Sequence, residues 1–242
     1  MEIPKTNNKV EKIDLNLFSK KQESFLSVNK KYKNIDTVYV NKRSSSYSEH
    51  DANRNTLVYY SGNLKKDGTV ENISGYDYSI NPIFPVYKSF HNNGNIKTKG
   101  VVCWFGFDIG VWYHFDENGN VIKTIDYDEG FDFTYQQVFE FCEERGIPLV
   151  KKNKGNRTKI WKQVISDDKY YWHIEYPIIE KIKNIDTKAL KKEIEQGIYI
   201  KIEENEYIKN VSKHVKLDGK TGEILETKES PLPIFEEDID DN

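Results

Sequence analysis

One short pattern occurs twice in the middle of the chain and limits what it can fold into. Phe90 stands three residues before Asn93-Gly94-Asn95-Ile96, and Phe115 stands three residues before Asn118-Gly119-Asn120-Val121, an offset of 25 residues. Asn-Gly between alternating apolar residues is a strong hairpin signal, since both residues tolerate the positive φ of a type I′ turn. The repeat therefore predicts two consecutive β-hairpins in an antiparallel sheet.

A fainter third copy stands upstream, where Asp67-Gly68-Thr69-Val70 precedes Asn93-Gly94 by 26 residues. Self-similarity at such a period is typical of stacked hairpin units that share one core. The repeat region therefore extends back toward Val58.

Strand periodicity in the second copy places Val111, Tyr113 and Phe115 on one face of the sheet and Trp112 and His114 on the other. Both faces carry bulky side chains. We therefore expect a sheet that is covered on both sides or that carries an aromatic ladder across its strands.

The region from Phe84 to Gly130 resembles the MORN-like repeat variant, whose pattern runs aromatic-x-x-N-G, spacer, G-x-W-x-x-aromatic and N-G again. Gly110 to Gly119, which reads G-V-W-Y-H-F-D-E-N-G, carries the resemblance. Such repeats occur in bacterial antitoxins and in immunity proteins of polymorphic toxins, and also in general interaction and envelope modules. The resemblance thus implies a binding protein with a hairpin-built sheet.

The chain before this repeat is less regular. Residues 1–33 suggest a partly ordered lead-in with a short helix near 19–27. A strand is expected at 35–40, a polar loop at 44–55 and a further strand at 56–61.

After the repeat, the apolar period changes from that of a strand to that of a helix. Asp132 or Thr134 is a candidate N-cap for a helix that ends at Arg145-Gly146, and residues 151–157 form a basic linker. Strands are predicted at 159–165, 170–176, 198–202 and 207–217, a helix at 187–196, and a hairpin turn at 218–223.

This second half resembles a small PepSY-like module. The resemblance is carried by the helix over 133–145, by Trp161-Lys162-Gln163-Val164, by Tyr171-Trp172-His173-Ile174, and by the run D-G-K-T-G-E-I-L over 218–225. Modules of that type are mostly non-catalytic binding or inhibitory units, commonly outside the cytoplasm. The helix expected at 187–196 departs from the simple pattern.

Composition narrows the functional classes. The chain has 16 Tyr and 12 Phe, and its net charge of −3 does not suit a nucleic-acid binder. The sequence shows no apolar leader and no stretch long enough to span a membrane, so a cytoplasmic location is expected. Cys103 and Cys142 both stand among apolar residues, which favours buried reduced thiols.

The sequence shows no catalytic constellation, no metal-ligand spacing and no phosphate-binding loop. The closest approaches to a metal pattern are His114 with Asp116 and His173 with Glu175, and neither is joined by a further ligand pair. Packed or exposed histidines explain these pairs better. We therefore expect no enzyme activity, no catalytic or metal residues and no cofactor.

Acidic residues gather in two places. Residues 124–148 carry seven carboxylates against Arg145, a net charge of −6, and residues 226–242 also carry −6. Carboxylates interleaved with aromatic side chains suit the binding of a basic protein surface. An ordinary solvated helix face beside an acidic tail is the plainer interpretation. The candidate partner-binding residues are Asp126, Tyr127, Asp128, Glu129, Asp132 and Tyr135.

These observations predict an α+β protein built on antiparallel sheets. The expected parts are the lead-in over 1–33, the hairpin repeats over 34–130, the helix-plus-sheet module over 131–226 and an acidic tail over 227–242. The expected function is that of a non-enzymatic immunity or antitoxin protein that neutralises a cognate toxin with a basic active-site surface. The alternatives are an envelope-associated glycan- or lipid-binding module and a hydrolase with a scattered site.

Overall fold

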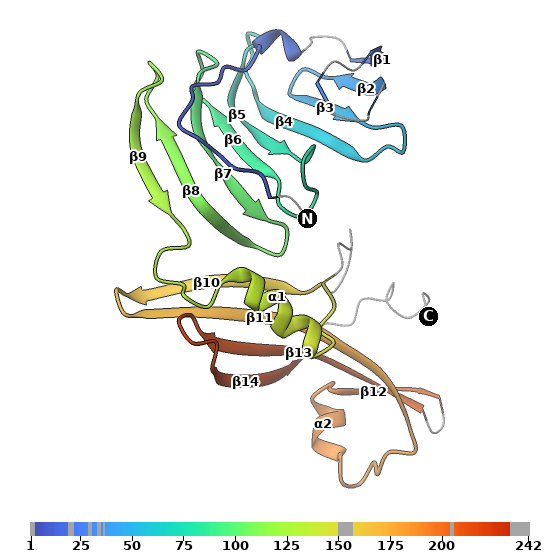
Figure 1. Cartoon of the computed structure of the whole chain (residues 1–242). Coiled ribbons are helices and arrows are strands. Elements are labelled where there is room, and N and C mark those ends of the chain that lie inside the picture. Colours follow the sequence, from blue (N-terminus) through green and yellow to red (C-terminus); the bar gives the residue numbers. More distant parts are fainter. Residues whose placement is uncertain are drawn as a thin grey trace. The chain divides into compact units, whose positions relative to one another are not determined.

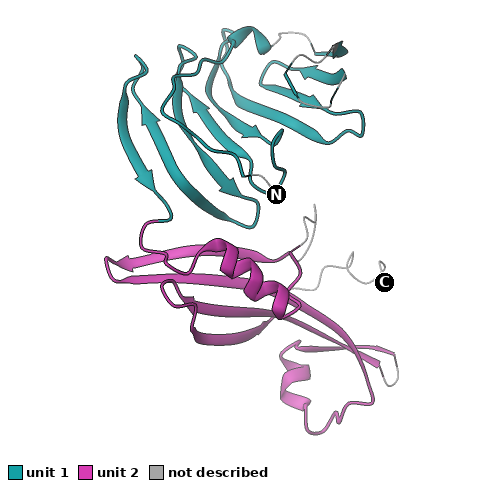
Figure 2. Cartoon of the chain, viewed as in Figure 1, with its two compact units in different colours: residues 1–128 teal, residues 129–242 magenta. Residues whose placement is uncertain are grey.

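The chain consists of two compact units, residues 1–128 and residues 129–242 (Figure 2). The computed structural model describes residues 3–18, 22–28, 31–32, 35, 37–149, 157–203 and 206–232. Most of the predicted linker (151–156) and most of the predicted acidic tail (233–242) lie outside these ranges. The predicted fold class is confirmed, since both units are built mainly on antiparallel sheet and the second carries a small helix.

The described part of the first unit forms one nine-stranded meander, in which each strand pairs with the strands before and after it in sequence (Figure 1). Short turns favour this order because they join antiparallel neighbours directly. The strands are β1 (Glu23–Val28), β2 (Thr37–Lys42), β3 (Ser46–His50), β4 (Thr56–Leu64), β5 (Val70–Asp77), β6 (Val86–Phe90), β7 (Ile96–Cys103), β8 (Phe107–Phe115) and β9 (Val121–Asp126).

The repeated Asn-Gly turns have a different geometry from the predicted type I′. In the turn His91–Asn95, the amide of Gly94 donates to the carbonyl of His91 at 2.9 Å, and the amide of His91 donates to the carbonyl of Asn95 at 2.8 Å. Gly94 has φ +85°, whereas Asn93 is not among the residues with positive φ. This is a three-residue loop with a G1 bulge, which needs only one left-handed residue.

The same two hydrogen bonds close the turns Asp116–Asn120 and Lys65–Thr69, which confirms the third copy of the repeat. They also close Asp51–Asn55, where Arg54 stands at the left-handed position with φ 65°. The side chain of Asp51 accepts the amide hydrogens of Asn53 and Asn55, as Asp116 does for Asn118 and Asn120.

This fourth turn corrects the prediction of a polar loop over 44–55. The segment contains strand β3 and a hairpin of the repeated type, but an arginine replaces the glycine that marks the other copies. The predicted helix near 19–27 is also wrong, because residues 23–28 form strand β1 and pair with β2.

The N-terminal segment, residues 3–18, lies along the sheet (Figure 1) and ends in the 3₁₀ turn η1 (Leu15–Leu17). The amide of Ile96 donates to the carbonyl of Glu11, and the amide of Ile13 donates to the carbonyl of Gly94, both at 2.9 Å. Ile13 joins the hydrophobic core between this segment and one face of the sheet. The segment therefore acts as a strap, a name used below for residues 3–18.

A buried lysine fastens the strap. The ammonium of Lys99 is 2% exposed and donates to the carbonyl of Lys9 at 2.6 Å and to Glu11 Oε1 at 2.8 Å. The other oxygen of Glu11 accepts from Lys88 at 2.6 Å. Burial raises the pKa of Glu11, but the hydrogen bonds and charges of the two lysines outweigh it and hold the pKa below its ordinary value.

The opposite face of the sheet carries the expected aromatic ladder. Ring centroids lie 5.4 Å apart for Tyr76 and Tyr87, 5.8 Å for Tyr87 and Trp112, and 5.4 Å for Trp112 and Tyr127. Gly100 on β7 leaves the room that the Trp112 ring occupies, since a Cβ there would lie 2.0 Å from it. Each ring covers part of the next ring, so side chains of the sheet's own strands cover this face.

The described part of the second unit is a five-stranded antiparallel sheet with one main helix. Its elements match the predicted strands and helices, and most bounds differ by a few residues. The strand predicted at 170–176, however, continues to residue 183, and residues 227–231, predicted as part of the acidic tail, belong to the last strand. They are α1 (Tyr135–Glu144), β10 (Lys159–Ser166), β11 (Lys169–Lys183), α2 (Lys191–Glu195), β12 (Tyr199–Glu203), β13 (Glu206–Asp218) and β14 (Ile224–Pro231).

Helix α1 lies over one face of this sheet (Figure 1) and buries Val138, Phe141 and Cys142. The segment before it is anchored at Trp172 of β11, which is fully buried and whose Nε1 donates to the carbonyl of Phe133 at 2.7 Å. Phe131 packs edge-on against the Trp172 ring, with centroids 5.1 Å apart. This anchor fixes where the helix begins.

Replacing Glu11 with alanine should destabilise the first unit. Lys99 would keep its carbonyl partner but lose its counter-charge in a buried place, so we expect a cost of about 2–3 kcal/mol in urea-induced unfolding. The matched control is Glu117→Ala, which removes an exposed carboxylate from a turn of the same sheet. Equal effects of the two changes would contradict this assignment.

Replacing Gly100 with alanine should disturb the aromatic ladder, because the added methyl group would overlap the Trp112 ring. We expect a loss of about 2–3 kcal/mol from overpacking. Gly110→Ala in the same sheet is the control, since its Cβ meets open space and only its φ of +62° is unfavourable. That strain costs about 1 kcal/mol. A Gly100→Ala variant as stable as Gly110→Ala would refute the role given to Gly100.

Candidate functional site

The predicted partner-binding residues divide between the two units. Asp126, Tyr127 and Asp128 end the first unit, and the other three, Glu129, Asp132 and Tyr135, begin the second. The two groups are therefore described separately.

The residues of the first group hold β9 to β8. Asp128 is half-buried, and its Oδ2 accepts the amide hydrogen of Gly110 at 2.9 Å. Asp126 Oδ1 accepts the amide hydrogen of Asp128 at 3.0 Å. The amide of Tyr127 donates to the carbonyl of Gly110 at 3.0 Å, and its ring ends the aromatic ladder at Trp112. Of the three side chains, the carboxylate of Asp126 is the exposed one.

The residues of the second group lie at and before the start of α1. Glu129 and Asp132 are exposed, and the described residues show no ion pair for either carboxylate. Tyr135 is half-buried, with its ring centroid 6.1 Å from that of Phe139. Thr134 starts the helix through a capping box with Gln137, as the sequence predicts for one of its two candidate caps.

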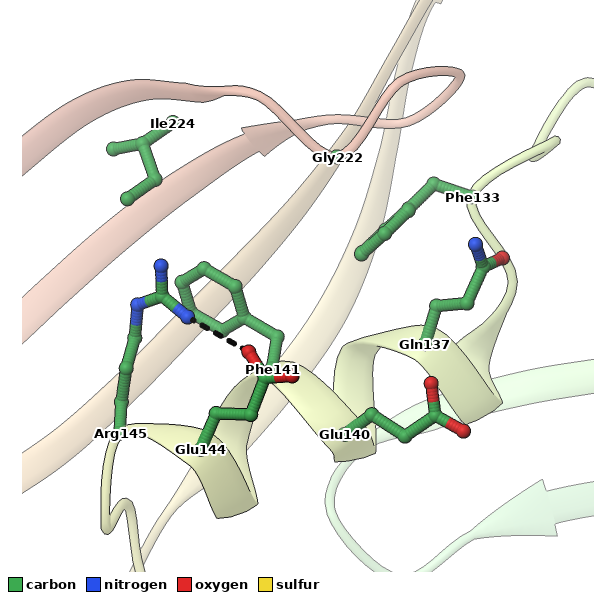
Figure 3. A pocket seen from close by; sticks show the side chains of 8 residues that line it. All are labelled: Phe133, Gln137, Glu140, Phe141, Glu144, Arg145, Gly222 and Ile224. Carbon is green, nitrogen blue, oxygen red and sulfur yellow. Dashed lines mark ion pairs between the residues drawn. The ribbon is translucent and has the colours of Figure 1, made fainter.

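A groove of about 400 Å³ lies beside α1 (Figure 3). One wall is the helix, which contributes Gln137, Glu140, Phe141, Glu144 and Arg145. The other sides are formed by the ring of Phe133 before the helix and by Gly222 and Ile224 of the hairpin between β13 and β14.

The D-G-K-T-G-E run shapes this groove. Gly222 has φ +76°, and a Cβ there would lie 2.4 Å from the Phe133 ring, so glycine lets the ring rest against the turn. Asp218 Oδ1 accepts the amide hydrogens of Lys220 and Thr221, both at 2.9 Å. The apolar floor is partly open, since Ile224 is 46% exposed.

Carboxylates edge this apolar floor. Arg145 Nη1 lies 3.6 Å from Glu144 Oε2, and its guanidinium lies 3.8 Å from the centroid of the Phe141 ring (Figure 3). Glu140 is exposed one turn earlier. The charge count over 124–148 included these glutamates, but no sequence signal placed Ile224 opposite them.

A second polar cluster lies on the face of the sheet that bears Trp161, His173 and His214. His173 Nδ1 lies 2.9 Å from His214 Nε2, and His173 Nε2 lies 2.8 Å from Gln163 Oε1. The ring of Trp161 stacks on that of His173 at 5.0 Å between centroids. Burial, with the nearby charges of His214 and Lys216, lowers the pKa of His173 to about 4.

The described residues include both cysteines and the possible metal ligands His, Asp and Glu. Both cysteines are free and buried, and burial raises the pKa of Cys142 to about 12, which keeps it a thiol at neutral pH. Over the described ranges, no three His, Cys, Asp or Glu side chains converge as metal ligands would.

Compared with models of known protein families and with curated proteins, the sequence matches none of either. No helix in the described part of the chain has the length and apolar character required to cross a membrane.

The low pKa of His173 predicts a pH-dependent stability of the second unit. An unfolded histidine takes up a proton below pH 6.5, whereas folded His173 does so only near pH 4. Protons therefore favour the unfolded state in this window, and the free energy of unfolding should rise by roughly 1–2 kcal/mol between pH 4 and 6.5. Urea titrations at several pH values measure this slope.

His173→Gln should flatten that slope, and His50→Gln in the first unit should leave it unchanged. A slope that His173→Gln does not alter would assign the pH dependence to another group.

Proposed function

We propose that the protein is a non-enzymatic bacterial immunity or antitoxin protein that binds a cognate protein toxin in the cytoplasm and blocks its active site. The observation that carries the proposal is the α1 groove, where exposed carboxylates edge an apolar, aromatic floor. A basic surface with projecting side chains is the complement of such a groove.

Charge supports a protein partner of this kind. Glu140, Glu143 and Glu144 stand in the second half of α1, where the helix dipole adds negative potential. Glu129 and Asp132 extend the acidic surface before the helix. Complementary charge speeds encounter and rejects partners of the wrong sign, and an enzyme that acts on nucleic acid presents a basic cleft.

The structure changes which candidate residues suit a test of this proposal. Asp128 and Tyr127 hold β9 in place, so replacing them would disturb the fold as well as any surface. Glu129 and Asp132 are exposed, and their charges are free to be reversed without loss of a described hydrogen bond.

The first test is capture of the toxin with the intact protein as bait in extracts of its native host, followed by co-expression. The expected result is one tight partner that stops growth when expressed alone and is harmless together with this protein. The double change Glu129→Lys and Asp132→Lys should weaken that complex by about 2–3 kcal/mol in calorimetry. If the charge reversal leaves the affinity unchanged, the toxin binds another surface of this protein.

Glu117→Lys is the matched control, since it reverses an exposed charge in the first unit. If no captured protein is toxic, the immunity proposal is refuted.

The aromatic ladder favours one second candidate, the binding of an envelope glycan. Its three tyrosines, Tyr76, Tyr87 and Tyr127, are half-exposed, and burial together with the Asp108 charge raises the pKa of Tyr76 and Tyr127. Sugar rings pack on aromatic side chains beside such hydrogen-bonding groups. Retardation of the protein in gels that contain cell-wall polysaccharide would support this candidate, and unchanged mobility would exclude it for the polysaccharides used.

A further inference from the structure

One end of the α1 groove already holds an arginine of this chain. The guanidinium of Arg145 lies over the Phe141 ring and beside the Glu144 carboxylate (Figure 3). A planar cation gains from both neighbours, through the negative face of the ring and through the ion pair. The groove thus contains one example of the ligand chemistry that its walls accommodate.

The other end of the groove also has an aromatic ring and a carboxylate, but the described residues place no cation between them. Figure 3 shows Phe133, Gln137 and Glu140 grouped there, with the ring on one side and the carboxylate on the other. Gln137 is held in place, since its Oε1 accepts from the amide of Thr134 at 2.9 Å. No Lys or Arg of the described residues forms an ion pair with Glu140.

We propose that this end of the groove binds an arginine side chain of the partner protein, with its guanidinium stacked on the Phe133 ring and paired with the Glu140 carboxylate. The inference rests on the proposed function and assigns one point of contact within it. Gly222 borders this end of the groove beside the Phe133 ring, where the methylene stem of the arginine would lie (Figure 3).

Arginine suits this place better than lysine. Its guanidinium is flat and weakly hydrated, so it stacks on an aromatic ring while donating hydrogen bonds to a carboxylate in the same plane. The ammonium of lysine keeps a tighter hydration shell and presents no flat face. The Arg145 arrangement shows the required geometry at the other end of the same groove.

The test titrates the ¹⁵N-labelled full chain with the tripeptide acetyl-Gly-Arg-Gly-amide and follows its amide resonances by NMR. Saturable shifts are expected at Phe133, Gln137 and Glu140. The corresponding lysine tripeptide should bind about three- to fivefold more weakly. The citrulline tripeptide, which has the shape of arginine without its charge, should cause no saturable shift. Equal binding of the arginine and citrulline peptides would overturn the proposal.

Two variants of the same helix separate a specific contact from a general charge effect. Glu140→Gln should weaken arginine-tripeptide binding about tenfold, because it removes a charge-assisted hydrogen bond. Glu143→Gln removes the same charge from an exposed position outside the groove lining and should change binding little. Equal losses in the two variants would overturn the assignment to the groove.

The toxin complex distinguishes failure of this inference from failure of the proposed function. If the captured toxin binds Glu140→Gln as tightly as wild type, the groove does not receive its arginine, and the immunity function stands. If the tripeptide binds in the groove but no toxin exists, the site stands and the immunity function fails.

Discussion

The buried ammonium of Lys99 is the interaction on which the first unit depends. A lysine inside a sheet protein is costly unless its charge and hydrogen bonds are satisfied, and here the strap supplies a backbone carbonyl and the Glu11 carboxylate. The same strap brings Ile13 onto the apolar face of the meander. A nine-stranded sheet therefore obtains one of its two covers from a short irregular segment, and the other from its own aromatic ladder.

Much of this sheet was readable from the sequence, because its turns are local. The glycine of each Asn-Gly or Asp-Gly pair marks the single left-handed residue that the bulged loop requires. The sequence did not predict the Asp51–Asn55 turn, because Arg54 rather than glycine occupies its left-handed position. Hydrogen bonds to the Asp51 side chain stabilise this turn without a glycine. The strap was also missed, since its contacts join residues far apart in the chain and follow no periodic pattern.

The sequence predicted the acidic charge of the candidate site but not the groove in which it lies. A count of carboxylates over 124–148 found the acidic character of α1. The carboxylate count could not show that the chain divides into two units after Asp128, or that Asp128 accepts a hydrogen bond from the Gly110 amide. It also could not show that the hairpin after β13 would set Ile224 opposite the helix. Such pairings arise from tertiary packing, which a local pattern does not encode.

The strap also sets an order of events during synthesis. The ribosome releases Glu11 early, yet its partner Lys99 follows 88 residues later. Each hairpin, by contrast, closes a loop of a few residues and loses little chain entropy in doing so. Strand pairing in the meander is thus local, whereas the strap can complete its contacts only after β7 has been made. Until β7 has been made, the apolar face that Ile13 covers in the folded unit is exposed to water, and chaperones that bind nascent chains can bind it.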